Sequence, residues 1–388
     1  MTDVKITDSV KYIGVSDRTL DLFESQYIIP NGMAYNSYVI FDEKIAIMDT
    51  ADKRVTDAWF ANLEAALDGK KPDYIVTHHM EPDHAANLIK LIKKYPDIKV
   101  VGNAKTFTFV KQFFGAVISD RAVIVKEGDK LSLGAHELTF IMAPMVHWPE
   151  VMFSYDSKDK ILFAADAFGK FGALDCDEDW ACEARRYYFN IVGKYGMQVQ
   201  AVLKKAAALD IQIICPLHGP ILTENLGYYI GLYDTWSKYE PESKGIFVAY
   251  TSIHGNTKAA VEKFADMLRA KGAEKVVVSD LAREDQAECV EDAFRYDRIV
   301  VAAPSYDAGL FPPAEEFIAH LKAKNYQKRT VGIIENGSWA PSAGKILKAA
   351  FEDMKGITIL EPLVSIRSAL NADSEAALEA LADALINA

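Results

Sequence analysis

From residue 245 onward, short apolar runs alternate regularly with amphipathic helical patterns, and this alternation restricts the possible folds more than any other feature of the sequence. Strands are expected at 245–250, 275–280, 298–303, 330–335 and 357–362, and helices at 258–271, 285–296, 313–323, 343–355 and 374–386. Strands that are apolar throughout are typical of a parallel sheet with helices on both faces. Five strands, each followed by a helix, therefore predict an α/β domain with a doubly wound, five-stranded parallel sheet.

The first two thirds of the chain follow a different pattern, in which short strands mix with a few helices. Strands are expected at 100–104, 122–128, 138–144 and 160–166, and helices at 85–95 and 183–209. This part is α+β and rich in sheet. The pattern stops in a polar stretch at 239–245, which contains a proline and a glycine and is typical of a domain boundary. We therefore expect one domain at 1–243 and a second at 244–388.

Composition excludes several classes of function. The 388 residues include 43 Lys and Arg against 55 Asp and Glu, a formal charge of −12, so binding of nucleic acid through a positive field is excluded. Four cysteines are too few for a disulfide framework and form no C-x-x-C pair, so no rubredoxin-type iron site is expected. The acidic N-terminus is unlike a secretory signal, and no apolar segment is long enough to span a membrane. We expect a cytoplasmic protein that binds small ligands or other proteins.

Side chains that can bind metal follow several strands of the first part. A turn after an apolar run carries His79, Glu81, Asp83 and His84, and alternate positions of an extended turn point the same way. His79 and Glu81 can thus share one ion while Asp83 and His84 face a second. Single candidates follow at later strand ends, namely His147, Asp166 and His218. One histidine alone is more often a hydrogen-bonded core or surface residue, but the combination predicts a metal site. His78, His136, His254 and His320 have no such context, and no metal role is expected for them.

With these residues, about positions 1–245 resemble the metallo-β-lactamase superfamily, in which a His-x-His-x-Asp-His turn is followed by a lone His, a bridging Asp and a last His. The resemblance implies an αββα sandwich. One position differs, because Glu81 stands where a zinc hydrolase of the superfamily has His. A carboxylate in place of imidazole makes the site harder and more negative, which suits iron in both its ferrous and ferric states. Redox chemistry is therefore favoured over hydrolysis.

The second part carries three loops that suit a flavin phosphate and ring. The first follows the strand at 245–250 and places hydroxyl groups and a glycine at the start of a helix, a geometry that holds a phosphate. A plain strand-to-helix turn is the alternative. Two further loops lie at carboxyl ends of parallel strands, where ligands of open α/β sheets bind. Trp339 and Tyr306 are candidates to flank the isoalloxazine ring. The predicted FMN-binding residues are Thr251, Ser252, His254, Gly255, Asn256, Thr257, Pro304, Ser305, Tyr306, Asp307, Ala308, Gly309, Asn336, Gly337, Ser338 and Trp339.

Together, the two sets of motifs resemble the flavodiiron protein family, also called A-type flavoproteins, over essentially the whole chain. The resemblance implies FMN and two non-haem irons. It implies that one iron is held by His79, Glu81, His147 and Asp166, and the other by Asp83, Asp166 and His218, with Asp166 as the bridge. Members reduce dioxygen to water or nitric oxide to nitrous oxide, with electrons that pass through FMN. His84 is left open between a metal ligand and a proton donor, and Tyr195 and Tyr27 are candidates to act beside the ligands without binding metal.

The resemblance also implies partners. Family members typically form a head-to-tail homodimer, and the chain carries no fused rubredoxin or flavin reductase module, so a separate donor such as rubredoxin, or reduced deazaflavin, is expected. Two alternatives remain open. One is a zinc-dependent hydrolase of the lactamase superfamily with a vestigial flavodoxin domain, against which Glu81 argues. The other is an electron-transfer or oxygen-sensing protein whose irons do not turn over.

Overall fold

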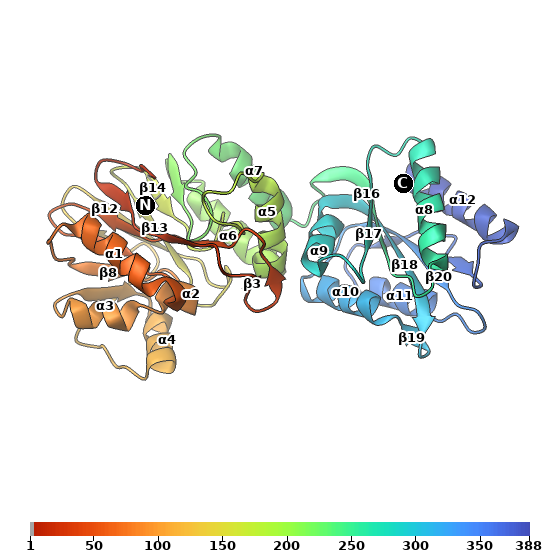
Figure 1. The fold of residues 1–388 in the computed structure, drawn as a ribbon. Coiled ribbons are helices and arrows are strands. Elements are labelled where there is room, and N and C mark those ends of the chain that lie inside the picture. Colours follow the sequence, from red (N-terminus) through yellow and green to blue (C-terminus); the bar gives the residue numbers. More distant parts are fainter. Residues whose placement is uncertain (1–3) are drawn as a thin grey trace. The chain divides into compact units, whose positions relative to one another are not determined.

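A computed structural model describes residues 4–388 and divides the chain into two compact units, each with its own sheets (Figure 1). The first unit comprises the chain up to Tyr188 together with Met197–Asp234, and the second comprises Phe189–Gly196 together with Thr235–Ala388. The short segment Phe189–Gly196 thus belongs to the second unit, although both flanking segments belong to the first. No helix of the described chain is long and apolar enough to cross a membrane.

Two sheets form the first unit. The six-stranded sheet has the order β1-β6-β7-β8-β9-β10, with β1 Val10–Tyr12, β6 Tyr38–Ile40, β7 Ala46–Met48, β8 Tyr74–Val76, β9 Lys99–Gly102 and β10 Ala122–Ile124. The five-stranded sheet has the order β11-β12-β13-β14-β15, with β11 Lys130–Ser132, β12 Glu137–Met142, β13 Met152–Asp156, β14 Ile161–Phe163 and β15 Ile213–Cys215. Two small antiparallel pairs complete it, namely β2 Val15–Asp17 with β5 Met33–Tyr35, and β3 Leu22–Phe23 with β4 Tyr27–Ile28.

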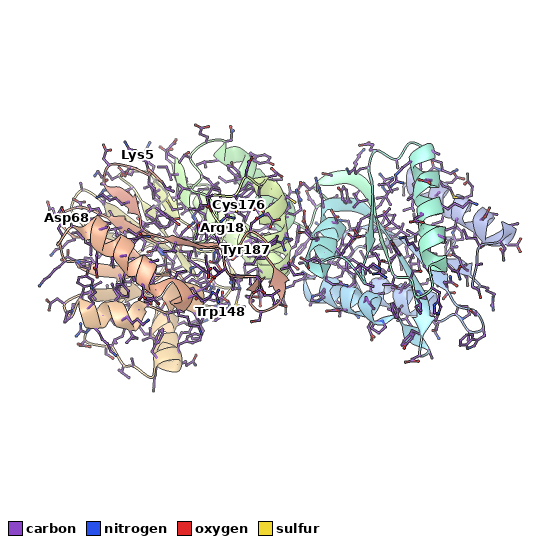
Figure 2. The ribbon with its side chains drawn as sticks, viewed as in Figure 1. Lys5, Arg18, Asp68, Trp148, Cys176 and Tyr187 are labelled. Atoms are coloured by element: carbon purple, nitrogen blue, oxygen red, sulfur yellow. The ribbon has the colours of Figure 1, made fainter. Side chains whose placement is uncertain are left out.

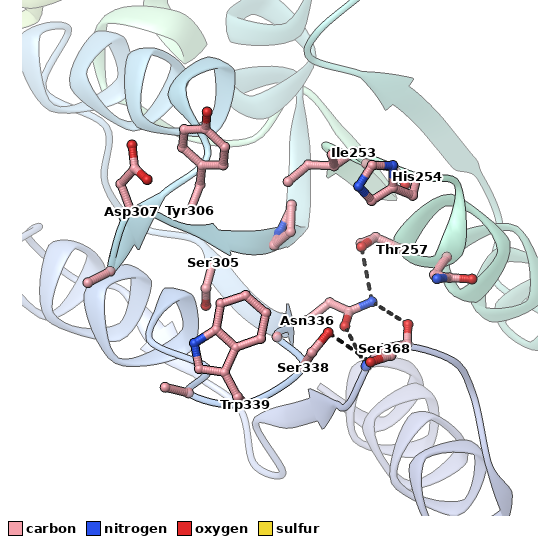
Figure 3. Close-up of a pocket in the computed structure, with 16 residues that line it drawn as sticks. Ile253, His254, Thr257, Ser305, Tyr306, Asp307, Asn336, Ser338, Trp339 and Ser368 are labelled. Atoms are coloured by element: carbon pink, nitrogen blue, oxygen red, sulfur yellow. Dashed lines mark hydrogen bonds between the residues drawn. The ribbon is translucent and has the colours of Figure 1, made fainter.

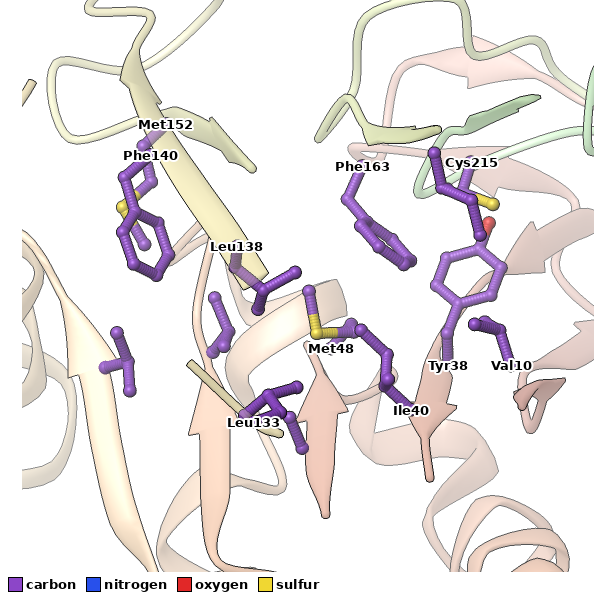
Figure 4. Packing of buried hydrophobic residues seen from close by; sticks show 14 of the residues in the cluster. Val10, Tyr38, Ile40, Met48, Leu133, Leu138, Phe140, Met152, Phe163 and Cys215 are labelled. Carbon is purple, nitrogen blue, oxygen red and sulfur yellow. The ribbon is translucent and has the colours of Figure 1, made fainter. Parts of the chain in front are cut away.

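The core of this unit lies between the two sheets. Ile40 and Met48 from the six-stranded sheet pack in one cluster with Phe140 and Phe163 from the five-stranded sheet (Figure 4). Sheets that share a core in this way are stacked face to face, with helices outside them. The helices are α1 Thr56–Leu67, α2 Pro82–Ala85, α3 Leu88–Lys94, α4 Ala104–Phe114, α5 Trp180–Tyr187, α6 Gly196–Ala206 and α7 Leu226–Ser237, with a 3₁₀ turn at Lys53–Val55. The expected αββα sandwich is confirmed.

The prediction of a single helix at 183–209 is wrong. The chain instead forms α5, a π-helical turn at Tyr188–Val192, a 3₁₀ turn at Gly193–Tyr195 and then α6. The hydroxyl of Tyr239 lies among the backbone groups of this segment, since it donates to the Gly193 carbonyl at 2.8 Å and accepts from the Gly196 N–H at 3.1 Å. A side chain that takes up backbone groups interrupts the regular helical hydrogen bonds, and only contacts distant in sequence reveal this.

The second unit contains the predicted parallel sheet, with the strand order β17-β16-β18-β20-β21. Its strands are β16 Ser243–Tyr250, β17 Val276–Asp280, β18 Tyr296–Tyr306, β20 Thr330–Asn336, β21 Thr358–Ile359 and β22 Val364–Ile366, with β19 Gly309–Leu310 paired to β18. Its helices are α8 Asn256–Ala270, α9 Gln286–Arg295, α10 Pro312–Ala323, α11 Ala343–Glu352 and α12 Ala372–Asn387. Val248 and Val300 pack on one face with α8 and α12, while Phe247 contacts Phe317 of α10 on the other. The doubly wound fold is confirmed.

The fifth strand differs from its expected extent of 357–362. It is split into β21 and β22, which both pair in parallel with β20. Pro362 lies between the two pieces and has no N–H to donate to a neighbouring strand. Continuous pairing is therefore interrupted at this point, and the second half of the strand resumes two residues later.

Candidate metal centre and flavin pocket

The predicted metal ligands lie on loops that follow β8, β12, β14 and β15. The loop after β8 carries His79 and ends at Glu81, which directly precedes the short helix α2, and Asp83 follows Pro82 in the first turn of that helix. The loops after β12, β14 and β15 supply one residue each, namely His147, Asp166 and His218. Figure 2 shows the side chains of both units and labels Trp148 and Tyr187, whose rings lie 5.3 Å from that of His79 and 5.6 Å from that of His218, respectively.

A first group of donor atoms comes from His79, Glu81, His147 and Asp166, all within 4.8 Å of one another. His147 Nε2 lies 3.1 Å from Glu81 Oε2 and 3.0 Å from Asp166 Oδ2. His79 Nε2 lies 3.2 Å from the same Glu81 oxygen. Glu81 is partly exposed and the other three are buried. Two imidazole nitrogens and two carboxylates therefore converge on one point.

A second group comes from Asp83, His84 and His218, all three buried. His84 Nε2 lies 3.0 Å from His218 Nε2 and 3.3 Å from Asp83 Oδ2. Asp166 connects the two groups, because its Oδ1 lies 3.2 Å from His84 Nε2 while its Oδ2 belongs to the first group. The structure thus brings together all six residues predicted as ligands, and His84 with them.

The buried carboxylate of Asp83 lacks hydrogen-bond partners among the described residues, which indicates that the two donor groups can bind a cation. Both of its carboxylate oxygens are buried and accept no hydrogen bond. Burial, together with the charges of Glu81 and Asp166, raises the pKa of Asp83 to about 8 against the lowering effect of His84. A cation would supply the missing partner for this carboxylate, since buried charges are stable only when they are paired or bind metal. Mixed imidazole and carboxylate donors fit iron.

The charges of the histidines act in the opposite direction on Asp166. Burial alone would raise the pKa of its carboxyl, but His79 and His84 hold that pKa well below its usual range. Burial would lower the pKa of His79, yet the Asp166 charge and a hydrogen bond with Glu150 raise it well above its usual value. Asp166 is therefore the anionic centre around which the histidines gather.

Hydrogen bonds outside the two groups orient the imidazole rings. His79 Nδ1 lies 2.8 Å from Glu150 Oε1, which also accepts the Met80 N–H at 2.8 Å. His218 Nδ1 lies 2.7 Å from the Ala34 carbonyl oxygen. Each contact leaves Nε2 directed at the centre, the usual arrangement of metal-binding histidines. Sequence reasoning missed Glu150, whose only signal is an acidic residue in the same loop as His147.

Aromatic rings enclose the second group. The rings of Phe23, Tyr35 and Tyr187 lie 5.5, 5.9 and 5.6 Å from that of His218. The Tyr187 hydroxyl is buried and has no hydrogen-bond partner within the described part of the chain. Burial raises the pKa of Tyr187 well above its usual value, and Asp166 adds to this effect. An unpartnered donor beside the ligand carboxylates is thus available at Tyr187, which the sequence analysis did not select.

The two tyrosines that were selected have other surroundings. Tyr195 lies in the 3₁₀ turn of the second unit, and the ammonium of Lys194 lies 6.0 Å from its ring centre. Tyr27 is buried in the first unit, where its ring lies 5.9 Å from that of Phe171. A catalytic role for Tyr195 stays a prediction.

Of the histidines expected to have no metal role, His78 lies outside both groups and bonds to Asp49 and Ser154. His136 belongs to a third set with Asp156 and Asp159 whose donor atoms also lie within 4.8 Å of one another. Lys158 Nζ lies 3.0 Å from His136 Nε2. An ammonium at that distance disfavours a metal cation there.

The three loops predicted to bind flavin line one pocket of about 470 Å³ in the second unit (Figure 3). The predicted residues in its lining are Ser252, His254, Asn256, Thr257, Pro304, Ser305, Tyr306, Asp307, Ala308, Asn336, Gly337, Ser338 and Trp339. Thr251, Gly255 and Gly309 lie outside the lining, while Ile253, Ala340 and Ser368 were missed. Ser368 follows β22, and the sequence analysis ended the fifth strand at residue 362, so the loop after β22 was not considered.

One end of the pocket is the start of α8. Gly255 precedes the helix with φ +90° and provides no side-chain cap, and a Cβ there would meet open space. The Ser252 hydroxyl accepts from the Gly255 N–H at 3.1 Å and from the Lys258 N–H at 3.2 Å. Asn336 Nδ2 donates to Thr257 Oγ1 at 3.3 Å and to the Ser368 carbonyl at 3.0 Å, so the loops are tied together. This end offers hydroxyls and helix N–H groups to an anion.

The other end carries two aromatic side chains, Tyr306 and Trp339, away from Thr257 (Figure 3). Trp339 is 88% exposed and Tyr306 is 45% exposed. A tight turn at Asp307 and Ala308, both with positive φ, joins β18 to β19 and holds Tyr306 at this end. Exposed aromatic faces over a pocket suit a flat aromatic ligand.

Known proteins resemble the chain in both parts. Residues 33–219 match the family described as ODP family beta lactamase, and residues 247–354 match the flavodoxin domain. A nitric oxide reductase of Moorella thermoacetica is 29% identical, with 92% of each chain covered. The structure of the rubredoxin oxygen:oxidoreductase from Desulfovibrio gigas has a TM-score of 0.92 at 23% identity, with 99% of this chain and 98% of that chain covered. The flavodiiron protein from Giardia intestinalis has a TM-score of 0.90 at 24% identity, with 100% and 96% covered.

Proposed function

Because the chain belongs to the flavodiiron protein family, we propose that it reduces dioxygen to water, nitric oxide to nitrous oxide, or both, with electrons that pass through FMN. Its cofactors are FMN and two non-haem irons. The observation that carries the proposal is the pair of adjacent donor groups that share Asp166. A binuclear site of this kind suits a two-atom substrate.

In this proposal His79, Glu81, His147 and Asp166 hold one iron, and Asp83, Asp166 and His218 hold the other. When bound, the two irons supply electrons to the gas molecule and polarise it. The contacts of His84 favour a ligand role, because its Nε2 faces the same point as Asp83 and His218. Its Nδ1 is buried without a hydrogen-bond partner, so a proton relay through the ring has no supplier among the described residues.

Protons must reach the gas as it is reduced, and Tyr187 is the better-placed donor. Its ring lies 5.6 Å from that of His218, and its buried hydroxyl has no hydrogen-bond partner among the described residues. Its raised pKa keeps the phenol protonated at neutral pH. Tyr187 would therefore donate a hydrogen bond to a bound oxygen atom without losing an existing one.

The flavin pocket completes the electron path. FMN, when bound, takes electrons from a donor and returns them one or two at a time. Ser252, Asn256 and Thr257 would bind its phosphate at the start of α8, while Tyr306 and Trp339 would cover its ring. Trp339 would bury the most surface on binding, since it is 88% exposed.

We also propose a rubredoxin or a similar small protein as the donor, a cytoplasmic location, and a head-to-tail homodimer. The donor is suggested by the Desulfovibrio gigas protein, which is named for rubredoxin and oxygen. No disulfide joins the four cysteines within the described chain, which suits a reducing compartment.

Product analysis tests the proposed reaction. Protein purified without air would be reduced chemically, then supplied with dioxygen or with nitric oxide in separate vessels. The proposal predicts water without released peroxide in the first vessel, or nitrous oxide in the second. If the protein reduces neither dioxygen nor nitric oxide, the proposal is wrong.

A further inference from the structure

A second cavity lies in the first unit, away from the residues assigned to metal. Its volume is about 250 Å³, and residues of the five-stranded sheet and of the helices α6 and α7 line it. Strand residues such as Leu162 and Ile214 form one wall, and Val199 and Val202 of α6 form another. Every described lining residue is aliphatic or phenylalanine except Tyr233.

The polar group of Tyr233 does not make this cavity attractive to water. Its hydroxyl oxygen accepts the N–H of Phe168 at 2.6 Å, and its ring stacks on that of Phe168 at 4.3 Å. Water needs two to four polar partners to occupy a cavity, and an apolar cavity of about 150 Å³ stays dry and takes up benzene or xenon. The cavity is therefore suited to small apolar molecules.

The cavity is connected to the metal centre by adjacent residues of the sequence. Ala167 and Phe168 line it, and they directly follow Asp166, the residue common to both donor groups. The turn that contains them is tight, since Ala165 has φ +46° and Phe168 has φ +66°. The same turn therefore carries the proposed bridging ligand and two residues of the cavity lining.

We propose that this cavity binds a small apolar gas molecule, dioxygen or nitric oxide, and supplies it to the metal centre. Both gases are poor hydrogen-bonding partners and favour apolar space over water. The supply role rests on the proposed function, whereas binding of a small apolar molecule follows from the cavity alone. A longer acyl chain is the competing occupant.

Xenon is the probe for binding, because it needs no turnover. Holoprotein crystals would be pressurised with xenon, and the same would be done for Ala206→Phe, which points a large ring at the cavity from α6. Ala201→Phe places the same ring on an exposed position of α6 outside the lining and is the matched control. We expect xenon in the wild type and the control, and its loss in Ala206→Phe.

Steady-state kinetics then test supply. In Ala206→Phe the KM for the gas should rise roughly threefold or more, while kcat and the iron and FMN content stay at wild-type values. If that variant does not fold, Val202→Ala enlarges the cavity instead and should raise the xenon occupancy and lower the KM. The proposal would be overturned if the wild type binds no xenon or if mass spectrometry finds a bound acyl chain. It would also be overturned if Ala206→Phe loses xenon but keeps the wild-type KM. If xenon binds but the protein reduces neither gas, the proposed function is wrong and the supply role fails with it. The cavity would then still be a binding site for small apolar molecules.

Discussion

Glu150 performs two tasks with one oxygen at the metal centre. Its Oε1 contacts His79 Nδ1 and accepts the N–H of Met80, each at 2.8 Å, and the residue is completely buried. A carboxylate behind an imidazole ligand fixes the ring and makes it a better donor to metal. The ligands therefore depend on a residue that binds no metal itself.

Replacing Glu150 by Gln tests this dependence. The amide keeps the shape and can still accept the Met80 N–H, but it lacks the charge that supports His79. We expect iron affinity to fall about 10- to 100-fold, measured by competition with a chelator, with FMN content unchanged. Glu127→Gln, at an exposed ion pair with Lys205, is the control and should bind iron normally. Equal iron affinity in both variants would contradict the role given to Glu150.

Asp166 and His84 differ in how many irons they would touch. Asp166→Asn removes the only carboxylate common to both groups, so both irons should be lost in large part. His84→Asn removes one nitrogen from the second group, so about one iron should remain per chain. Iron quantification per chain measures both. Full iron retention in His84→Asn would show that His84 is not a ligand.

The clustering of the proposed ligands could be predicted from the sequence, because His79, Glu81 and Asp83 lie close together in one segment and the other candidates follow strand ends. Their partners could not. Glu150 and Tyr187 carry no local pattern, and their roles arise from packing between loops far apart in the chain. Tyr195 was selected instead of Tyr187, since neither tyrosine is distinguished by its neighbours in the sequence.

The start of α8 is the element on which FMN binding depends. Thr257 is buried in its first turn, and its hydroxyl accepts from Asn336. Thr257→Leu removes that hydroxyl and adds bulk inside the pocket, so we expect FMN to dissociate at least about tenfold more readily, which corresponds to about 1.4 kcal/mol. Fluorescence of released flavin measures this. Ala259→Leu, on the exposed side of the same helix, should leave flavin binding unchanged, and equal binding in both variants would mean that the phosphate lies elsewhere.

The break between α5 and α6 depends on a close contact at Gly196. A Cβ at this position would lie 2.3 Å from the Ser237 carbonyl oxygen and 2.7 Å from the Tyr239 ring. Gly196→Ala should therefore destabilise the protein by about 1–3 kcal/mol, seen as a lower urea midpoint. Gly231 lies in α7 with open space around it, and Gly231→Ala should stabilise by about 0.5–1 kcal/mol. If both substitutions change the free energy of unfolding in the same direction, this account is wrong.

The elements of the parallel sheet could be predicted well because each strand is apolar throughout and each helix has its own amphipathic period. The exceptions have local causes. The fifth strand is split around Pro362, and the helix expected at 183–209 is interrupted where Tyr239 bonds to its backbone. Both depend on pairing with distant segments, which periodicity does not reveal.

At the scale of the whole molecule, one unit holds the metal donors and the other holds the flavin pocket. Neither unit alone accounts for reduction of a gas, because a flavin without the irons lacks the binuclear site and the irons without flavin lack a source of electrons. The change from one sequence pattern to another near 239–245 already indicates that the chain has two parts with different folds. The account thus requires both cofactors in the same chain.

The most direct test is a single-turnover experiment with an anaerobic, fully reduced protein of known metal and flavin content. The account predicts about two irons and one FMN per chain, which together store four electrons, enough to reduce about one dioxygen per chain to water. Stopped-flow absorbance would show flavin and iron reoxidised together, with no peroxide detected. Zinc in place of iron, absence of flavin, or reoxidation that releases one peroxide per dioxygen would contradict the central claim.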